Sequence, residues 1–187
     1  LPMLVELYKS CIDFYIKDDL YPGSPLLIHH FLRQQDRAHG IEWHEEDYET
    51  LKHVLKKSSV NPFYQNGYDA LKGFLPPPAR RGLVLIDPPF EKKDEFSTLK
   101  EGIKHALKRF ANGTYLIWFP IKDEKAENFY KPLLTSTKSF VIKYGTTRPT
   151  MGLSLAGLLV INPPFGLQEA LMDSRSWLHA CIHIEFE

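Results

Sequence analysis

GLVLIDPPF, residues Gly82–Phe90, is an apolar run that ends at an aspartate, two prolines and an aromatic ring. Consecutive apolar residues are typical of a strand covered on both faces, as in a parallel sheet flanked by helices. Because proline cannot donate a hydrogen bond to a β-ladder, Pro88 and Pro89 end the strand directly after Asp87. The segment therefore predicts a buried strand with a carboxylate at its carboxyl end.

Segments with helical and strand-like periodicity alternate on both sides of this strand. The predicted helices cover residues 24–37, 47–57, 68–74, 96–110, 124–134 and 166–180, and the predicted strands cover residues 39–43, 61–65, 83–86, 114–119, 139–145 and 156–161. Helices between successive strands indicate a parallel α/β sheet, and two late strands with no helix between them indicate an antiparallel pair at one edge. We expect a Rossmann-like α/β sandwich and one domain, residues 1–187.

The composition excludes several classes of protein. No apolar run approaches the length of a membrane span. Cys11 and Cys181 are too few for a disulfide framework, and no signal sequence opens the chain, so we expect a cytoplasmic protein. Lys and Arg balance Asp and Glu at 23 each, so any nucleic-acid surface must be local. The sequence does not determine the oligomeric state, and we favour a monomer.

The Asp-Pro-Pro-Phe turn has the groups needed to activate an amine on a nucleobase. Such an amine is a poor nucleophile because its lone pair is delocalised into the ring. Asp87 and a carbonyl held by Pro88 and Pro89 can accept hydrogen bonds from both amine hydrogens, and Phe90 can stack on a base taken out of its helix. The alternative is that the turn only terminates a strand.

A second copy, NPPF at Asn162–Phe165, differs in two ways that decide its role. Asn162 lacks a carboxylate, and its strand belongs to the expected antiparallel pair, away from the point where strand order reverses. We interpret this copy as a structural turn.

The chain resembles the bacterial RlmJ family of 23S rRNA adenine-N6 methyltransferases. The resemblance runs in collinear order from about Tyr21 through YPGSPLL, RQQD, EWHEEDY, NGYDALKGFLPPPARRGLVLIDPPFE, RFANGTYLIWFP, VINPPF and SWLH. It implies a Rossmann-like class I methyltransferase sandwich with a mostly parallel sheet, and methyl transfer from S-adenosylmethionine to one adenine of 23S rRNA. Members are also described as proteins for using external DNA as a nutrient, so the alternative is a nucleic-acid-binding protein without catalysis.

The resemblance also assigns individual residues. Asp87 and Phe90 are implied to be the catalytic acceptor and the base-stacking ring. The implied cofactor contacts are Ser24, Glu42, the Asn66–Gly67 pair and Asp87 itself. A carboxylate at the end of a strand, such as Glu42, suits hydrogen bonding to ribose hydroxyls, although it could also be a solvated loop acid. Asn66 departs from the family, which has an aspartate there to receive the adenine amino group of the cofactor.

Two features of the family are not found in the sequence. The family begins with a basic stretch that grips RNA, followed by a strand with a Gly-rich turn that cradles the methionine part of the cofactor. Neither lies in these 187 residues, and the first residue is Leu rather than Met. We therefore expect the methyltransferase domain to be incomplete at its N-terminus.

Basic residues bracket the strand that ends at Asp87, and we expect them to meet RNA phosphates. They are Arg80, Arg81, Lys92 and Lys93. Weaker candidates lie on the helix that follows, at Lys104, Lys108 and Arg109, and in the segment 144–148.

A metal site is not expected. His179, Cys181 and His183 lack the paired spacing of zinc ligands, so we interpret them as packing and surface residues.

Overall fold

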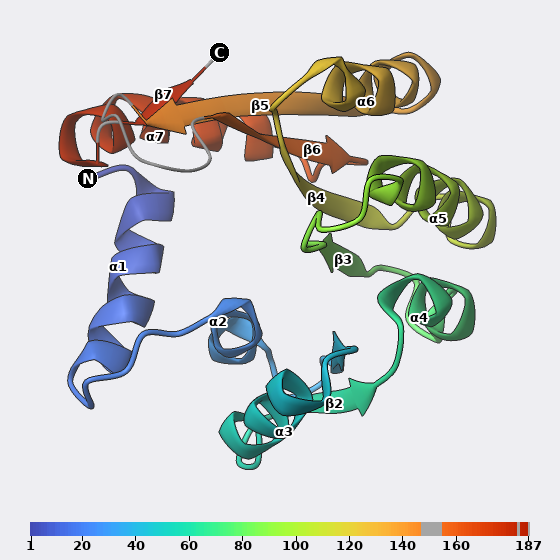
Figure 1. Ribbon diagram of the computed structural model, residues 1–187. Coiled ribbons are helices and arrows are strands. Elements are labelled where there is room, and N and C mark those ends of the chain that lie inside the picture. Colours follow the sequence, from blue (N-terminus) through green and yellow to red (C-terminus); the bar gives the residue numbers. More distant parts are fainter. Residues whose placement is uncertain (147–154, 183, 187) are drawn as a thin grey trace. The chain divides into compact units, whose positions relative to one another are not determined.

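The computed structural model describes residues 1–146, 155–182 and 184–186, and the chain forms two compact units (Figure 1). The first unit is Met3–Gly73, and the second comprises Phe74–Glu187 with Leu1–Pro2. The expectation of one domain over residues 1–187 stays a prediction. Within the described residues, no helix combines the length and apolar character that a membrane span requires.

The first unit contains a parallel two-stranded sheet covered by helices. Its elements are α1 (Met3–Ile16), α2 (Ser24–Phe31), β1 (Ala38–Glu42), α3 (Glu45–Val54), β2 (Val60–Tyr64) and α4 (Gly67–Phe74), whose last residue belongs to the second unit. β1 pairs with β2 in register from Ala38↔Val60 to Glu42↔Tyr64, so both strands end at the same edge. α2 and α3 pack against both strands. Helix α1 was not predicted, because none of the usual capping residues precedes it.

Helix α2 is shorter than the predicted helix over residues 24–37. Gly23 is its N-cap residue, and the Gly23 carbonyl accepts from the backbone N–H groups of Leu26 and Leu27, both at 3.1 Å. The helix ends at Phe31 because the next residues fold back on themselves. The Arg33 guanidinium donates to both carboxylate oxygens of Asp36, at 3.0 Å each, which closes a local turn. Because Ser24 precedes Pro25, the sequence predicts Ser24 as the N-cap, and this prediction is wrong: Ser24 is the first residue of the helix.

The second unit contains a mixed five-stranded sheet in the order β3-β4-β6-β5-β7. Its elements are β3 (Leu83–Ile86), α5 (Glu95–Arg109), β4 (Thr114–Pro120), α6 (Glu124–Ser136), β5 (Ser139–Thr146), β6 (Leu155–Ile161), α7 (Leu167–Ile182) and β7 (Ile184–Phe186). β3 and β4 are parallel, and β6 is antiparallel to both β4 and β5. The Rossmann-like α/β fold with antiparallel strands near the C-terminus is therefore confirmed.

The position of the antiparallel strand differs from the prediction. β6 lies inside the sheet, between β4 and β5, rather than in an edge pair, and β7 adds an outer strand that was not predicted. Because β6 runs against β4, with Ile161 opposite Tyr115, its last residue lies where β4 begins. Asn162 is therefore at the opposite edge of the sheet from Asp87, which follows the last residue of β3.

Helices cover both faces of this sheet. The alternate β4 residues Tyr115, Ile117 and Phe119 are fully buried beneath the layer that contains α5 and α6, which pack against each other. On the other face, α7 packs on a cluster centred on Phe140 and Val160. This is the three-layer arrangement expected when helices connect parallel strands.

Phe119 requires a glycine on the neighbouring strand. Gly157 stands opposite Phe119 in the register of β4 and β6. A Cβ atom at Gly157 would lie 2.2 Å from the Phe119 Cζ atom, so no side chain fits beneath this buried ring. The close approach lets the ring pack against Phe129 and Tyr130 of α6, at centroid distances of 5.5 and 5.6 Å.

Strand β3 is less covered than its sequence predicts. Leu83 is 61% exposed and Leu85 is 36% exposed, while Val84 and Ile86 are half-buried. Within the described residues β3 pairs only with β4, so it is an edge strand of this sheet. The prediction of burial on both faces is wrong, because the face of β3 that carries Leu83 and Leu85 is exposed.

Candidate active site

Asp87 belongs to a small cluster at the edge where β3 and β4 end. Ile86 pairs with Ile117, so Asp87 follows at the level of Trp118. The indole N–H of Trp118 donates to the hydroxyl of Tyr144 on β5 at 2.8 Å. Burial and the charge of Asp87 raise the pKa of Tyr144, whereas the bond from Trp118 lowers it. Asp87, Trp118 and Tyr144 therefore interact at one edge of the sheet.

The carboxyl group of Asp87 has an environment suited to proton transfer. It is exposed enough to reach a substrate, yet partial removal from water raises its pKa above the ordinary aspartate value. Among the described residues no cation forms an ion pair with it. A carboxylate with a raised pKa is a stronger base than a salt-bridged one, because no positive charge stabilises its ionised form.

Phe90 is held in an unusual backbone conformation after the two prolines. Its φ is +51°, in the left-handed region that residues other than glycine seldom adopt. The ring centroid lies 4.8 Å from that of Phe96 and 6.0 Å from that of Trp118. The ring therefore packs near Trp118, the residue at the level of Asp87.

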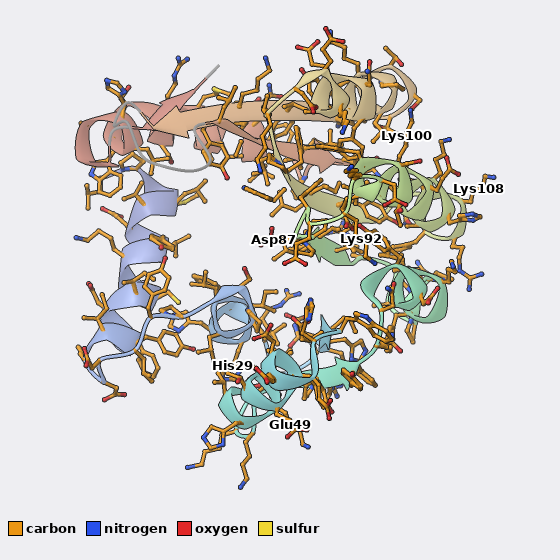
Figure 2. The ribbon with its side chains drawn as sticks, viewed as in Figure 1. His29, Glu49, Asp87, Lys92, Lys100 and Lys108 are labelled. Carbon is orange, nitrogen blue, oxygen red and sulfur yellow. The ribbon has the colours of Figure 1, made fainter. Side chains whose placement is uncertain are left out.

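A pocket of about 210 Å³ opens next to Phe90. Four lysines line it together with Phe96, Pro120 and the acidic residues Glu91 and Asp123: they are Lys92, Lys93, Lys122 and Lys125. Figure 2 labels Asp87 at the end of β3 and Lys92 in the segment that follows. The sequence analysis identified the first two lysines and missed the other two. The signal for Lys122 and Lys125 was the run IKDEK, residues 121–125, which directly follows β4. The loops after adjacent parallel strands lie at the same edge of the sheet.

The predicted basic residues do not all gather at this pocket. Arg80 and Arg81 precede β3, so the length of the strand separates them from Asp87. The Arg80 carbonyl accepts from the Asn112 side chain at 3.3 Å, near the start of β4. The structure thus places two of the four residues at the Asp87 edge and two at the opposite edge.

In the first unit, Glu42 ends β1 with an ordered carboxylate. Its Oε1 atom accepts from the backbone N–H groups of Trp43 at 2.6 Å and His44 at 2.8 Å. Within the described residues no group donates to Oε2. The side chain is therefore oriented by its own loop while one oxygen stays available to a ligand.

An exposed aromatic pair lies beside Glu42. The rings of Trp43 and Tyr64 are stacked with centroids 5.8 Å apart and planes 17° apart, and they are 55% and 50% exposed. Large exposed aromatic surfaces commonly mark binding sites. The sequence analysis missed Trp43, although an aromatic residue directly after a strand-ending acid was a visible signal.

Asn66 is the N-cap of α4. Its side-chain oxygen accepts from the backbone N–H groups of Tyr68 at 2.9 Å and Asp69 at 3.3 Å. The side-chain oxygen of Asn66, the acceptor available to an adenine amino group, is therefore engaged in the cap. At Gly67, an added Cβ atom would meet nothing within 4 Å, so the space next to this backbone is open to a ligand.

The predicted cofactor residues divide between the two units. Glu42, Asn66 and Gly67 lie at or just beyond the ends of β1 and β2, and Ser24 is the first residue of α2. Asp87 belongs to the other unit. A joint cofactor site that includes Ser24 and Asp87 stays a prediction.

Asn162 of the second Asx-Pro-Pro-Phe copy is hydrogen-bonded to the turn before β4. Its side chain donates to the backbone carbonyls of Ala111 and Gly113, both at 2.8 Å, and its backbone carbonyl accepts from the Thr114 hydroxyl at 2.9 Å. These bonds tie the end of β6 to that turn. They support the interpretation of this copy as a structural turn, which stays a prediction.

Two minor candidates remain. In the segment 144–148, residues 144–146 belong to β5, and residues 147–148 lie outside the described residues, as does His183. In the described part of the chain, no three His, Cys, Asp or Glu side chains are grouped so that they could hold a metal ion.

Comparison with known proteins identifies close relatives. A family model described as "Ribosomal RNA large subunit methyltransferase D, RlmJ" matches residues 11–185. The chain is 34% identical to ribosomal RNA large subunit methyltransferase J of Escherichia coli K12, over 96% of this chain and 68% of that protein. It is 37% identical to the protein of the same name from Haemophilus influenzae, over 84% of this chain and 58% of that protein.

A solved structure shares the fold of the whole chain. The crystal structure of protein LPL1258 from Legionella pneumophila is similar with a TM-score of 0.85 and 30% sequence identity. The similarity covers 100% of this chain and 74% of that one.

Proposed function

We propose that this chain, which belongs to the RlmJ family of ribosomal RNA large subunit methyltransferases, is an adenine methyltransferase. It transfers a methyl group from S-adenosylmethionine to the N6 amine of an adenine in 23S rRNA. The family expected from the sequence is confirmed. One observation carries the proposed chemistry: Asp87 follows directly on a parallel strand, beside Trp118 and Tyr144, in a setting that raises its pKa.

Asp87 is the residue that activates the target amine. Its carboxylate accepts a hydrogen bond from the amine, and this draws the nitrogen lone pair out of the purine ring. When S-adenosylmethionine is bound, it supplies the methyl group as a sulfonium. The N–C bond forms as the S–C bond breaks, and one amine proton must then leave the nitrogen. Asp87 is placed to accept that proton and to pass it to water.

The aromatic residues position the base. An adenine can reach Asp87 only after it leaves its stack in the RNA. Phe90 offers a ring at the site, and Phe96 and Trp118 restrict that ring from two sides. Stacking on a ring that is already held in place costs little additional conformational entropy.

The first unit has groups that fit S-adenosylmethionine. The open oxygen of Glu42 suits a ribose hydroxyl, and the Trp43–Tyr64 pair offers a flat apolar surface to an adenine ring. Gly67 allows a ligand to approach the backbone closely. Asn66 would donate with its amide nitrogen rather than accept, because its oxygen caps α4.

The four lysines of the pocket beside Phe90 would neutralise phosphates near the target. No specific observation favours the alternative, a nucleic-acid-binding protein without catalysis that serves the use of external DNA. We place the reaction in the cytoplasm, where 23S rRNA is made and assembled, and no metal is needed for it.

The test is methylation of 23S rRNA transcribed in vitro, which carries no modification. The purified protein is incubated with S-adenosylmethionine labelled in its methyl group, and the RNA is digested to nucleosides. Labelled N6-methyladenosine in 23S rRNA, and none in a 16S rRNA control, is the expected result. Binding of both RNA and S-adenosylmethionine without formation of this nucleoside would overturn the proposal.

A further inference from the structure

A groove of about 680 Å³ lies between α5 and α6, away from the residues assigned to catalysis. Its lining includes the apolar side chains of Leu107 and Leu133. Four lysines also line it: Lys100, Lys104, Lys108 and Lys138. None of the residues that line the groove is acidic. The groove therefore combines positive charge with apolar surface.

Three of these lysines form a stripe along α5. Lys100, Lys104 and Lys108 are spaced four residues apart, which places them on one face of the helix at intervals of about 6 Å. Figure 2 labels Lys100 and Lys108 on α5. A regular row of cations matches the regular row of charges on a nucleic-acid strand, and an ordinary solvated helix face usually alternates charge signs.

The lysines of the groove are mostly not neutralised by neighbours. Lys104 pairs with the exposed Glu101 at 2.6 Å, and Lys100 donates to the backbone carbonyl of Asn128 at 3.4 Å. In the described part of the chain, no acidic side chain pairs with Lys108 or Lys138. An exposed pair such as Lys104–Glu101 contributes little, so a phosphate can replace it at small cost.

The groove and the pocket beside Phe90 occupy the two ends of the same helix pair. Phe96 in the first turn of α5 lines the pocket, and Lys108 in its last turn lines the groove. The rise of the helix separates them by about 18 Å, the length of about five stacked nucleotides. Beyond the groove lies the turn where Asn112 donates to the Arg80 carbonyl.

We propose that the α5–α6 groove binds the sugar-phosphate backbone of the RNA that flanks the target adenine. The inference rests on the proposed function, and it extends the RNA surface from the active-site pocket along α5 to its last turn. A lysine that contacts a phosphate acts as a point charge, and such a contact carries no sequence information. The groove therefore supplies affinity and register, while the residues at Asp87 select the adenine.

The test compares two RNA substrates with one variant. K100Q/K104Q/K108Q removes the stripe, and we expect KM for a long 23S rRNA fragment to rise at least about tenfold in 150 mM salt with kcat unchanged. The slope of log KM against log salt should fall by about 2, since each phosphate contact contributes about 0.7 for a single strand. For a fragment with fewer than about five nucleotides on either side of the adenine, variant and wild type should be equal.

The matched control K52Q/K56Q/K57Q removes the same charge from the segment around α3 in the other unit, and it should behave as wild type. Equal KM values for the stripe variant and wild type on long RNA, or an equal loss in the control, would overturn the inference. Loss on the short fragment as well would also overturn it. Failure of the proposed function is distinct, because wild-type protein would then methylate neither fragment.

Discussion

Replacing Asp87 with asparagine separates the contribution of this side chain to the methylation rate from its contribution to the stability of the fold. Asparagine has the same size and keeps one acceptor oxygen, but it removes the charge and puts an NH₂ donor where the substrate amine needs an acceptor. Because Asp87 lies in an environment that raises its pKa, we expect the substitution to change activity and stability in opposite directions.

The loss of activity follows from the missing acceptor and base. A hydrogen bond to a charged group contributes about 1.5–3 kcal/mol, which corresponds to roughly 10- to 150-fold in rate if it forms only in the transition state. General-base catalysis contributes about 10²- to 10⁴-fold. We therefore expect kcat to fall by about 10²- to 10⁴-fold. The KM for RNA should change little, because contacts to phosphates dominate affinity.

The stability effect has the opposite sign. A raised pKa in the folded protein means that ionised Asp87 disfavours the fold. Wild type and Asp87→Asn should be equally stable below about pH 3.9, the ordinary aspartate value, where the acid is protonated in both states. As the pH rises through the folded pKa, wild type should lose stability relative to the variant. Since the side chain is exposed, the difference should stay below about 1 kcal/mol.

Single-turnover methylation of a 23S rRNA fragment and urea unfolding at several pH values measure the two effects. Asp87→Glu is a useful second variant, because it keeps the charge while moving it. A wild-type methylation rate for Asp87→Asn would remove Asp87 from the mechanism. A variant less stable than wild type at pH 7.5 would refute the inference that its carboxyl group has a raised pKa.

Three other substitutions test the cofactor residues and the core. Asn66→Asp restores a second acceptor oxygen while the first still caps α4. Calorimetry should therefore show S-adenosylmethionine binding about tenfold more tightly. Weaker binding would contradict the described orientation of the Asn66 amide. Gly67→Ala should weaken the binding of S-adenosylmethionine without lowering the melting temperature, since its Cβ meets nothing within 4 Å. As a control, Gly73→Ala in the same helix should leave that binding unchanged. Gly157→Ala should lower the free energy of unfolding by roughly 1–3 kcal/mol, because its Cβ would lie 2.2 Å from Phe119 Cζ, and an unchanged urea midpoint would show that the ring moves freely.

Much of the site could be predicted because it depends on short stretches of chain. The Asp87-Pro88-Pro89 turn is a property of successive residues, since proline restricts its own φ and cannot extend a ladder. The same holds for Glu42 at the end of β1. Asn66 was identified as a site residue, but its role was not, because the direction of its amide is set by the N–H groups of the helix that follows.

Other parts of the site depend on which strands become neighbours. Trp118 and Tyr144 are 26 residues apart, and their hydrogen bond spans β6, which lies between β4 and β5. From the sequence, two late strands without a helix between them fit an edge pair equally well. Lys122 and Lys125 join Lys92 for a similar reason, since β4 is parallel to β3 and ends beside it.

By itself, the sequence determined the order of the helices and strands from α2 to α7, the Asp-Pro-Pro-Phe turn and the family to which the chain belongs. Periodicity, proline and capping act over a few residues, so a linear reading captures them. Only the tertiary structure decided the order and register of the strands, and with them the surroundings of Asp87 and the lysines that share its edge. Those contacts arise from packing between distant segments, which no local pattern specifies.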